Sequence, residues 1–309
     1  MFPSTPTLTR RGALAGLSLL VANGLIGCST KAASPMRTSP TWIATPTESV
    51  SAVSSEIALP ATKTELEAVA RSRVLFGHQS IGMSLLDAFP SIFQAASVPV
   101  PTIANTEWPQ ARDTKTEPVI AQAWIGKNGD PKGKIRDFAA IFDKPIGATL
   151  EVALMKLGAV DFDVSTDIQA VFRDYTSTMD RLEAAHPDTV FLHSTATLTT
   201  QGDEWSPTSV DALGTIRDAV TDNAQRERYN ALVRTRYGDS GLLFDIADLE
   251  SQVGDGKVAA AGGDGPLYRV MNPTMSSDGL HLNPEGAQRI ANALLHLMGQ
   301  AVLSPRTSR

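Results

Sequence analysis

The stretch RVLFGHQSIG, residues 73–82, decides which fold this chain can adopt. Residues 73–76 favour a strand and run into Gly77, two polar residues, Ser80 and a further glycine. A strand that ends in a glycine-flanked turn is typical of a buried strand leading directly into a helix. Ser80 could simply close this turn, or it could be a nucleophile, and the stretch alone does not decide between the two.

The rest of the chain alternates short apolar runs with longer amphipathic ones. The runs predict five strands, at 73–76, 119–125, 151–157, 188–195 and 241–246. Apolar residues at helical spacing predict helices at 62–72, 84–96, 134–142, 166–186, 222–238 and 283–299. Pro90 is expected to kink or split the second helix, and Gly299 to end the last. The pattern predicts an α/β fold: a three-layer α/β/α sandwich around a mostly parallel, five-stranded sheet.

Two long stretches, 196–221 and 251–277, predict no helix or strand. Loops of this length in a compact domain are usually functional lids or disordered excursions, and we expect one or the other here.

The first 28 residues have the pattern of an export signal. Arg10 and Arg11 precede an apolar run that is too short to span a bilayer comfortably and ends in Leu-Ile-Gly-Cys. The arginines are similar to a twin-arginine signal, and the ending resembles a bacterial lipobox, in which Cys28 would be lipidated. Cys28 is the only cysteine of the chain, so attachment is its expected role, the alternative being a buried or incidental thiol. We therefore expect an exported, lipid-anchored protein of the cell envelope, facing the periplasm from the outer membrane if the cell has two membranes.

Composition separates a tether from a folded domain. Residues 29–60 are rich in Ser, Thr, Ala and Pro without periodicity and predict a disordered tether, followed by a domain at 61–303 and a tail at 304–309. The whole chain has 309 residues, 42% of them hydrophobic, and a formal charge of −6. No run of Lys or Arg indicates a nucleic-acid partner, and contact with a membrane is expected through the lipid anchor only.

A second motif supplies the groups that a serine nucleophile needs. Asp278 and His281 lie three residues apart in SSDGLHLNPEG, directly before a helix signalled by Asn-Pro. A carboxylate at this spacing can orient the imidazole and leave its other nitrogen free to accept a proton. Because Ser80 is expected at the carboxyl edge of the same sheet, the three residues predict a Ser–His–Asp triad. The alternative is a turn-capping hydroxyl and a loop ion pair.

These two motifs resemble the SGNH/GDSL hydrolase superfamily, of which the chain would be a divergent member. The likeness covers most of residues 70–300 in element order, with Gly-His-Gln-Ser standing where the family usually has Gly-Asp-Ser. It implies a flavodoxin-like sandwich and the activity of an esterase, lipase or carbohydrate deacetylase. It also implies that Ser80 is the nucleophile, His281 the general base and Asp278 its orienting partner. No cofactor is expected.

The resemblance further implies donors for an oxyanion. The family uses the amide of the serine, identified here with Ser80, a glycine after the second strand, identified with Gly126 or Gly129, and an asparagine after the third strand. Val160 stands where that asparagine is common. The side-chain amide of Asn128 is expected to substitute for it.

Other polar and aromatic side chains are expected near the same edge. Five should line or shape the pocket: His78, Gln79, Lys156, Asp161 and His193. Alternatives stay open for three of them: a hydrogen-bonded strand-end residue for His193, a side chain extending to the edge of the sheet for Lys156, and a turn former for Asp161. A metal bound by His78, His193 and His281 is an alternative, but no close-spaced ligand motif supports it, so no metal is expected. Trp108, Trp124 and Trp205 could stack on a sugar, although a core or lid role is favoured for each.

The sequence thus predicts an exported, lipid-anchored serine esterase that removes O-acyl groups from envelope or extracellular carbohydrate. Its partner would be a small-molecule or carbohydrate ester. Two alternatives stay open: an O-acyltransferase that uses the same triad, and a non-catalytic glycan- or protein-binding module on the same fold. The oligomeric state is not predicted.

Overall fold

The structure is a computed structural model, which describes residues 41–44, 59–106, 117–200, 219–254, 256–261 and 267–304. The expected export signal with Cys28, most of the expected tether, Trp108 and Trp205 lie outside these residues. Across the described ranges, no helix combines the length and the apolar character needed to cross a bilayer.

The central sheet has six parallel strands in the order β3-β4-β2-β5-β6-β7. The strands are β2 (Arg73–His78), β3 (Ile103–Asn105), β4 (Val119–Trp124), β5 (Val152–Met155), β6 (Val190–Ser194) and β7 (Leu243–Phe244). The predicted α/β class is confirmed, but the prediction of five strands is one too few. The additional strand, β3, is a three-residue edge strand, too short to show a periodic pattern.

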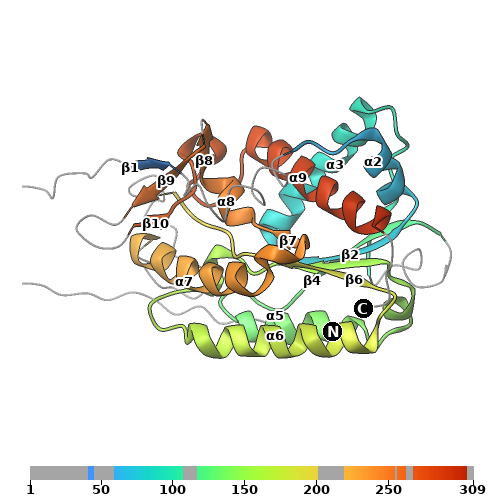
Figure 1. The fold of residues 1–309 in the computed structure, drawn as a ribbon, viewed down its shortest axis with the longest axis horizontal. Helices are drawn as coiled ribbons and strands as arrows, with labels where there is room; N and C mark the ends of the chain where they lie inside the picture. The colour runs from blue at the N-terminus through green and yellow to red at the C-terminus, as the bar shows by residue number, and fades with distance from the viewer. Residues whose placement is uncertain are drawn as a thin grey trace, which may run out of the picture. The chain divides into compact units, whose positions relative to one another are not determined.

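Helices cover both faces of this sheet (Figure 1). One face carries α2 (Lys63–Ala70), α3 (Ser80–Ala95), α8 (Ile246–Ser251) and α9 (Pro284–Leu303). The other face carries α5 (Pro131–Ile141), α6 (Ile168–Ala185) and α7 (Ala219–Tyr237). Side chains alternate along each strand, so Phe76 packs with the first group and Leu75 with the second. The two cores and the sheet between them make the three-layer sandwich. Short 3₁₀ turns complete the described chain: η1 (Pro145–Thr149), η2 (Ala159–Asp161), η3 (Gly238–Ser240) and η4 (Pro273–Met275).

Two helices differ from their predicted bounds. Helix α3 begins at Ser80 rather than at residue 84, and it contains Pro90 without being split. Helix α9 continues past Gly299 to Leu303. A Cβ atom at Gly299 would collide with Glu65 of α2. Gly299 is therefore a point of close helix–helix approach and not a helix stop.

A small antiparallel sheet forms where the sequence predicted no regular structure. It contains β8 (Gln252–Gly254), β9 (Lys257–Ala261) and β10 (Tyr268–Arg269), all from the stretch 251–277. Strand β1 (Thr41–Ala44) pairs with β9 in the register Thr41 to Ala260. Because β1 lies within the expected tether, the prediction of a disordered segment is wrong for these four residues. Their sequence, Thr-Trp-Ile-Ala, is the type that favours strands.

Candidate active site

The order of the strands in the sheet indicates where a ligand is expected to bind. Strand β2 has β4 on one side and β5 on the other, so the chain reverses its direction of travel across the sheet at β2. Open α/β sheets bind ligands at the carboxyl ends of the strands at such a reversal. Ser80 is the first residue of α3 and follows β2, which ends at His78. The fold therefore places Ser80 at the position where ligands bind in this class of sheet.

Ser80, His281 and Asp278 lie together, although 201 positions separate the serine from the histidine. The Oγ atom of Ser80 is 3.2 Å from Nε2 of His281. The Nδ1 atom of the same ring is 2.7 Å from Oδ2 of Asp278. Both distances are within hydrogen-bond range. The three side chains thus have the order and the spacing of a Ser–His–Asp triad.

The loop that carries the carboxylate also fixes its charge. Oδ1 of Asp278 accepts the backbone N–H groups of Leu280 at 2.9 Å and His281 at 2.6 Å. Burial by itself would raise the pKa of Asp278, but these hydrogen bonds and the contact with the ring outweigh it and hold the pKa below its ordinary value. The carboxylate is therefore charged at neutral pH and orients the imidazole toward Ser80.

The start of α9 anchors this loop. The side chain of Asn283 accepts the N–H of Gly286 at 2.8 Å, which caps the helix, and the N–H of Asn283 donates to the carbonyl of Met275 at 2.9 Å. A Cβ atom at Gly286 would lie 2.6 Å from that same carbonyl oxygen, so glycine is required. The motif Asn-Pro-Glu-Gly thus positions His281 through packing and capping.

A segment after β6 holds the triad loop from its other side. Thr200 donates its N–H to the carbonyl of Gly279 at 2.9 Å. Thr195, at the beginning of this segment, donates its hydroxyl to Asp245 at 3.0 Å. The residue following Asp278 is therefore connected to the end of β7 through residues 195–200.

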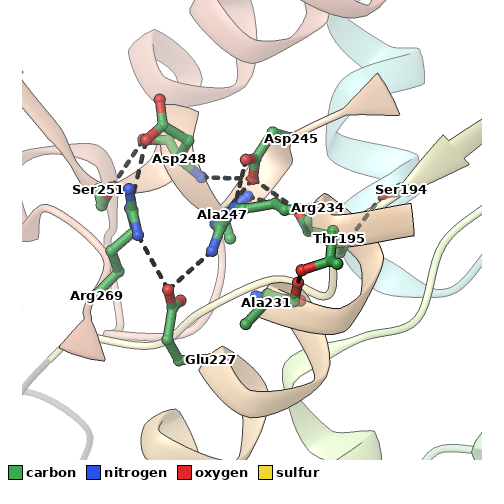
Figure 2. A network of polar contacts seen from close by, with 12 residues as sticks. Ser194, Thr195, Glu227, Ala231, Arg234, Asp245, Ala247, Asp248, Ser251 and Arg269 are labelled. Carbon is green, nitrogen blue, oxygen red and sulfur yellow. Dashed lines mark hydrogen bonds and ion pairs between the residues drawn. The ribbon is translucent and has the colours of Figure 1, made fainter. Parts of the chain in front are cut away.

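Asp245 belongs to a polar network that the sequence did not predict (Figure 2). Arg234 of α7 donates to Asp245 at 2.6 Å and to Glu227 at 2.8 Å. Arg269 of β10 donates to the same Glu227 at 3.0 Å and lies 3.3 Å from Asp248 of α8. The network joins the small sheet to α7 and α8. Its members alternate in charge, which reduces the cost of burying them.

The turn before Ser80 is built on His78. A Cβ atom at Gly82 would collide with the His78 side chain, so this glycine lets α3 begin directly over β2. The ring is fully buried, with Nδ1 donating to the Gln79 carbonyl at 2.8 Å and Nε2 at 3.1 Å from Gln122. Burial lowers the pKa of His78 to about 4, against the opposing effect of these hydrogen bonds and helped by the charge of Lys156. His78 supports the turn from beneath and does not line an open pocket.

Some of the expected oxyanion donors already donate a hydrogen bond to another residue, and others do not. Ser80 is the first residue of a 16-residue helix, so its N–H has no acceptor within the helix. Gly126 donates its N–H to Asp137 at 2.8 Å, and Gly129 donates to Asp161 at 3.0 Å. Acidic side chains have thus taken both glycine amides, and the prediction that either one binds an oxyanion does not hold in this geometry.

Asn128 keeps its side-chain donors available. Its Oδ1 accepts from Nζ of Lys134 at 3.2 Å, which requires the amide nitrogen to point the other way. That nitrogen donates no hydrogen bond to any residue in the described ranges. Lys134 is fully buried and is held by Asp161 at 2.7 Å. Sequence reasoning missed Lys134, because a lysine in an amphipathic helix gives no sign of being buried.

Gln79 and Asp161 connect the surrounding loops. The Gln79 amide donates to the carbonyls of Ile125 at 2.8 Å and Gly126 at 3.1 Å, which ties the loop containing Asn128 to the residue before Ser80. Asp161, besides binding Lys134, accepts the N–H of Gly158 at 2.7 Å. Asp161 is buried, so it braces the loops and is not a lining residue.

The remaining predicted pocket residues are also buried. Lys156 lies near Glu250, whose Oε2 accepts the N–H of Leu198 at 2.6 Å. Burial lowers the pKa of Lys156 and raises that of Glu250, the charge on each partially opposing the shift of the other. No sequence signal distinguished Glu250 from an exposed glutamate.

His193 faces away from the triad. It shares the strand face of Phe191, on the side of α5, α6 and α7. Its Nδ1 is 3.1 Å from the Tyr175 hydroxyl, its Nε2 is 3.3 Å from Glu183, and its ring stacks on Tyr237 at 3.5 Å between centroids. The prediction that His193 lines the site is therefore wrong, and its alternative, a hydrogen-bonded residue at the end of a strand, is confirmed. Among the described residues, no cluster of His, Cys, Asp and Glu side chains could hold a metal ion.

Solved structures that are similar to this chain share little of its sequence. No protein-family model and no curated protein matches the chain. Similar solved structures include a Streptococcus pneumonia protein described as a platelet activating factor (11% identity, TM-score 0.45, covering 80% of this chain and 91% of that one). Another is a Desulfitobacterium hafniense protein assigned to the lipolytic G-D-S-L family (9% identity, TM-score 0.43, covering 73% of this chain and 99% of that one). A third is the periplasmic domain of a lipopolysaccharide acetyltransferase of Salmonella ser. Paratyphi A (10% identity, TM-score 0.39, covering 82% of this chain and 89% of that one).

The chain has the α/β fold that the sequence resemblance to the SGNH/GDSL superfamily implies. At these identities and TM-scores the likeness carries no argument about this chain. The chemistry of the site must be argued from Ser80, His281 and Asp278 themselves.

Proposed function

We propose that the protein is a serine esterase of the SGNH type. The observation that carries the proposal is the pair of contacts on one imidazole, with Ser80 Oγ at 3.2 Å from Nε2 of His281 and Asp278 at 2.7 Å from Nδ1. Ser80 attacks the ester carbonyl while His281 accepts its proton, and the protonated ring then gives that proton to the departing alcohol. Water, deprotonated by the same ring, releases the acyl group and restores the serine.

Charge on the carbonyl oxygen during this reaction needs donors. The N–H of Ser80 at the start of α3 and the side-chain amide of Asn128 are the two that remain available. The Lys134–Asp161 pair supports this assignment, because it holds the amide oxygen of Asn128 and turns the nitrogen outward. In this proposal Asn128 replaces the asparagine that the family has at the position of Val160.

The cellular setting is also proposed from the sequence. The signal-like segment with Arg10 and Arg11, and the lipobox ending at Cys28, support an exported protein held at a membrane by its lipid alone. A substrate at that location would be an O-acyl group on envelope or extracellular carbohydrate. In cells producing the full chain, the Cys28→Ala variant should move from the membrane fraction to the soluble fraction, and a protein that stays with the membranes would contradict lipid anchoring.

Hydrolysis of 4-nitrophenyl acetate tests the activity. We expect turnover by the wild type and a loss on the order of 10³-fold or more in Ser80→Ala. Ser91→Ala is the matched control, because Ser91 lies on the same helix with an exposed hydroxyl bonded to the Ala88 carbonyl. This control should retain full activity. Equal rates for wild type and Ser80→Ala would contradict Ser80 as the nucleophile.

A non-catalytic binding module is the second candidate. It is favoured by one observation: the amides of Gly126 and Gly129, expected to bind an oxyanion, are hydrogen-bonded to carboxylates. If wild-type protein hydrolyses neither aryl nor sugar acetates but binds acetylated sugars, the fold serves recognition without catalysis.

A further inference from the structure

One large aromatic side chain near the triad is unusually exposed. In the described ranges, the exposed large hydrophobic side chains are Leu59, Val100, Trp124, Val164, Leu267 and Leu303. Trp124 is the only aromatic one among them and is 51% exposed. Tryptophan is usually well covered, because its indole loses much favourable burial when it is left in water. Of the two roles favoured for Trp124 by the sequence, core or lid, the core role is therefore wrong.

Trp124 lies close to Ser80. It is the last residue of β4 and pairs in register with His78 of β2, with their rings 5.5 Å apart between centroids. The N–H of Ile125 donates to the His78 carbonyl at 3.2 Å, which fixes the end of β4 against β2. Ser80 follows two residues after His78. From strand spacing and chain length, the Cα atoms of Trp124 and Ser80 are at most about 12 Å apart.

The indole also lies on the same side of the sheet as the triad. Side chains alternate along β4, so Trp124 shares the face of Ile120 and Gln122. Ile120 packs in the core beneath α3 and α9, and Gln122 reaches Nε2 of His78 on that side. This is the face from which α3 begins. The ring of His78 lies against the indole with the two ring planes tilted by 53°, and half of the side chain is left open to solvent.

The exposed surface has the chemistry of a sugar platform. A pyranose ring presents an apolar face of C–H groups and a rim of hydroxyls, so it packs on an aromatic face while its rim needs polar partners. The loop after Trp124 provides such a partner, since the side chain of Lys127 is exposed. An aliphatic ester chain could pack on the indole, but it has no rim of hydroxyls to contact the polar side chain of the loop.

We propose that Trp124 and the loop 125–130 form a subsite for a pyranose ring beside Ser80, which presents an acyl group carried on that sugar to the serine. The presentation of the ester rests on the proposed function, whereas binding of the sugar to Trp124 does not.

Kinetic specificity gives the first test. The full chain is assayed with methyl 6-O-acetyl-β-glucopyranoside and with ethyl acetate, and the ratio of the two kcat/KM values is compared between variants. We expect the wild type to prefer the sugar ester. In Trp124→Ala the ratio of the two kcat/KM values should fall about threefold to tenfold, which is the effect of one aromatic contact. Trp124→Phe should keep most of it. Leu267→Ala, which removes another exposed apolar side chain, should leave the ratio unchanged. A ratio unaffected by Trp124→Ala would overturn the subsite and leave the esterase proposal intact.

A binding measurement separates the subsite from catalysis. In Ser80→Ala protein, the indole N–H resonance of Trp124 is identified as the one missing from the additional Trp124→Phe variant. We expect that resonance to shift in a saturable manner when the acetylated glucoside is added, even if the wild type hydrolyses no ester. A resonance that does not move, or that moves equally with ethyl acetate, would overturn the proposal.

Discussion

The buried ring of His78 should make the protein less stable as the solution becomes acidic. Burial lowers the pKa of this ring from its ordinary 6.5 to about 4. Between these two pH values the unfolded chain carries a proton on His78 and the folded chain does not. Because the unfolded state binds more protons there, the free energy of unfolding falls as the pH falls. Relative to its value above pH 6.5, the free energy of unfolding falls progressively until about pH 4.

The size of the effect follows from the two pKa values. Each pKa unit corresponds to about 1.4 kcal/mol, so the full loss by pH 4 and below is about 3 kcal/mol. At pH 5 the same two values give a loss of about 2 kcal/mol relative to pH 7. This is a large part of the stability of an ordinary domain.

Urea titrations of wild type and His78→Gln at pH 7 and pH 5 measure this loss. The variant also loses the ring contacts with Phe76 and Trp124, so it should be less stable than wild type at pH 7. Contributions of all other titrating groups cancel in the difference between the two proteins. We expect the free energy of unfolding of the wild type to exceed that of the variant by about 2 kcal/mol less at pH 5 than at pH 7. An advantage that is the same at both pH values would refute the reasoning.

Three further predictions concern the site and its support. Asp278→Asn should lower kcat/KM for aryl acetates by a factor on the order of 10³ at neutral pH, since the ring loses its orienting charge; a change below tenfold would show that Asp278 is only a loop residue. Asn128→Ala should lower kcat about 10²-fold with little change in KM, as loss of one oxyanion donor does, and an unchanged kcat would remove Asn128 from the mechanism. Asn283→Ala should cost about 1 kcal/mol and lower the melting temperature by about 2–4 °C, whereas Asn283→Asp keeps a capping oxygen and should cost less. Equal melting of wild type and Asn283→Ala would contradict the importance of this cap.

The elements that the sequence predicted well are those whose signals are local. The strand 73–76, the capped helix beginning at Pro284 and the alternation between them depend on side chains that are near one another in the sequence. Pairing between distant segments has no such signal. Strand β1 pairs with β9 across more than two hundred positions, and β3 is only three residues long. Gly299 was assigned as a helix stop because the sequence cannot show that Glu65 packs against it.

The candidate site divides in the same way. Ser80, Asp278 and His281 are recognisable because their residue types and their positions next to a strand and a capped helix point to one chemistry. His193 was placed in the site only because it lies at the end of a strand, and its face depends on the alternation along β6. Burial of Lys134 and Glu250 depends on tertiary packing, which composition and periodicity do not report.

Covalent capture of the nucleophile tests the triad most directly. A fluorophosphonate reacts with a serine whose hydroxyl is activated by a neighbouring base, and peptide mass analysis locates the adduct. We predict that the wild-type chain carries the adduct on Ser80, and that Ser80→Ala and His281→Ala are not labelled. Wild-type protein that stays unmodified, or that is modified at another serine, would contradict the assignment.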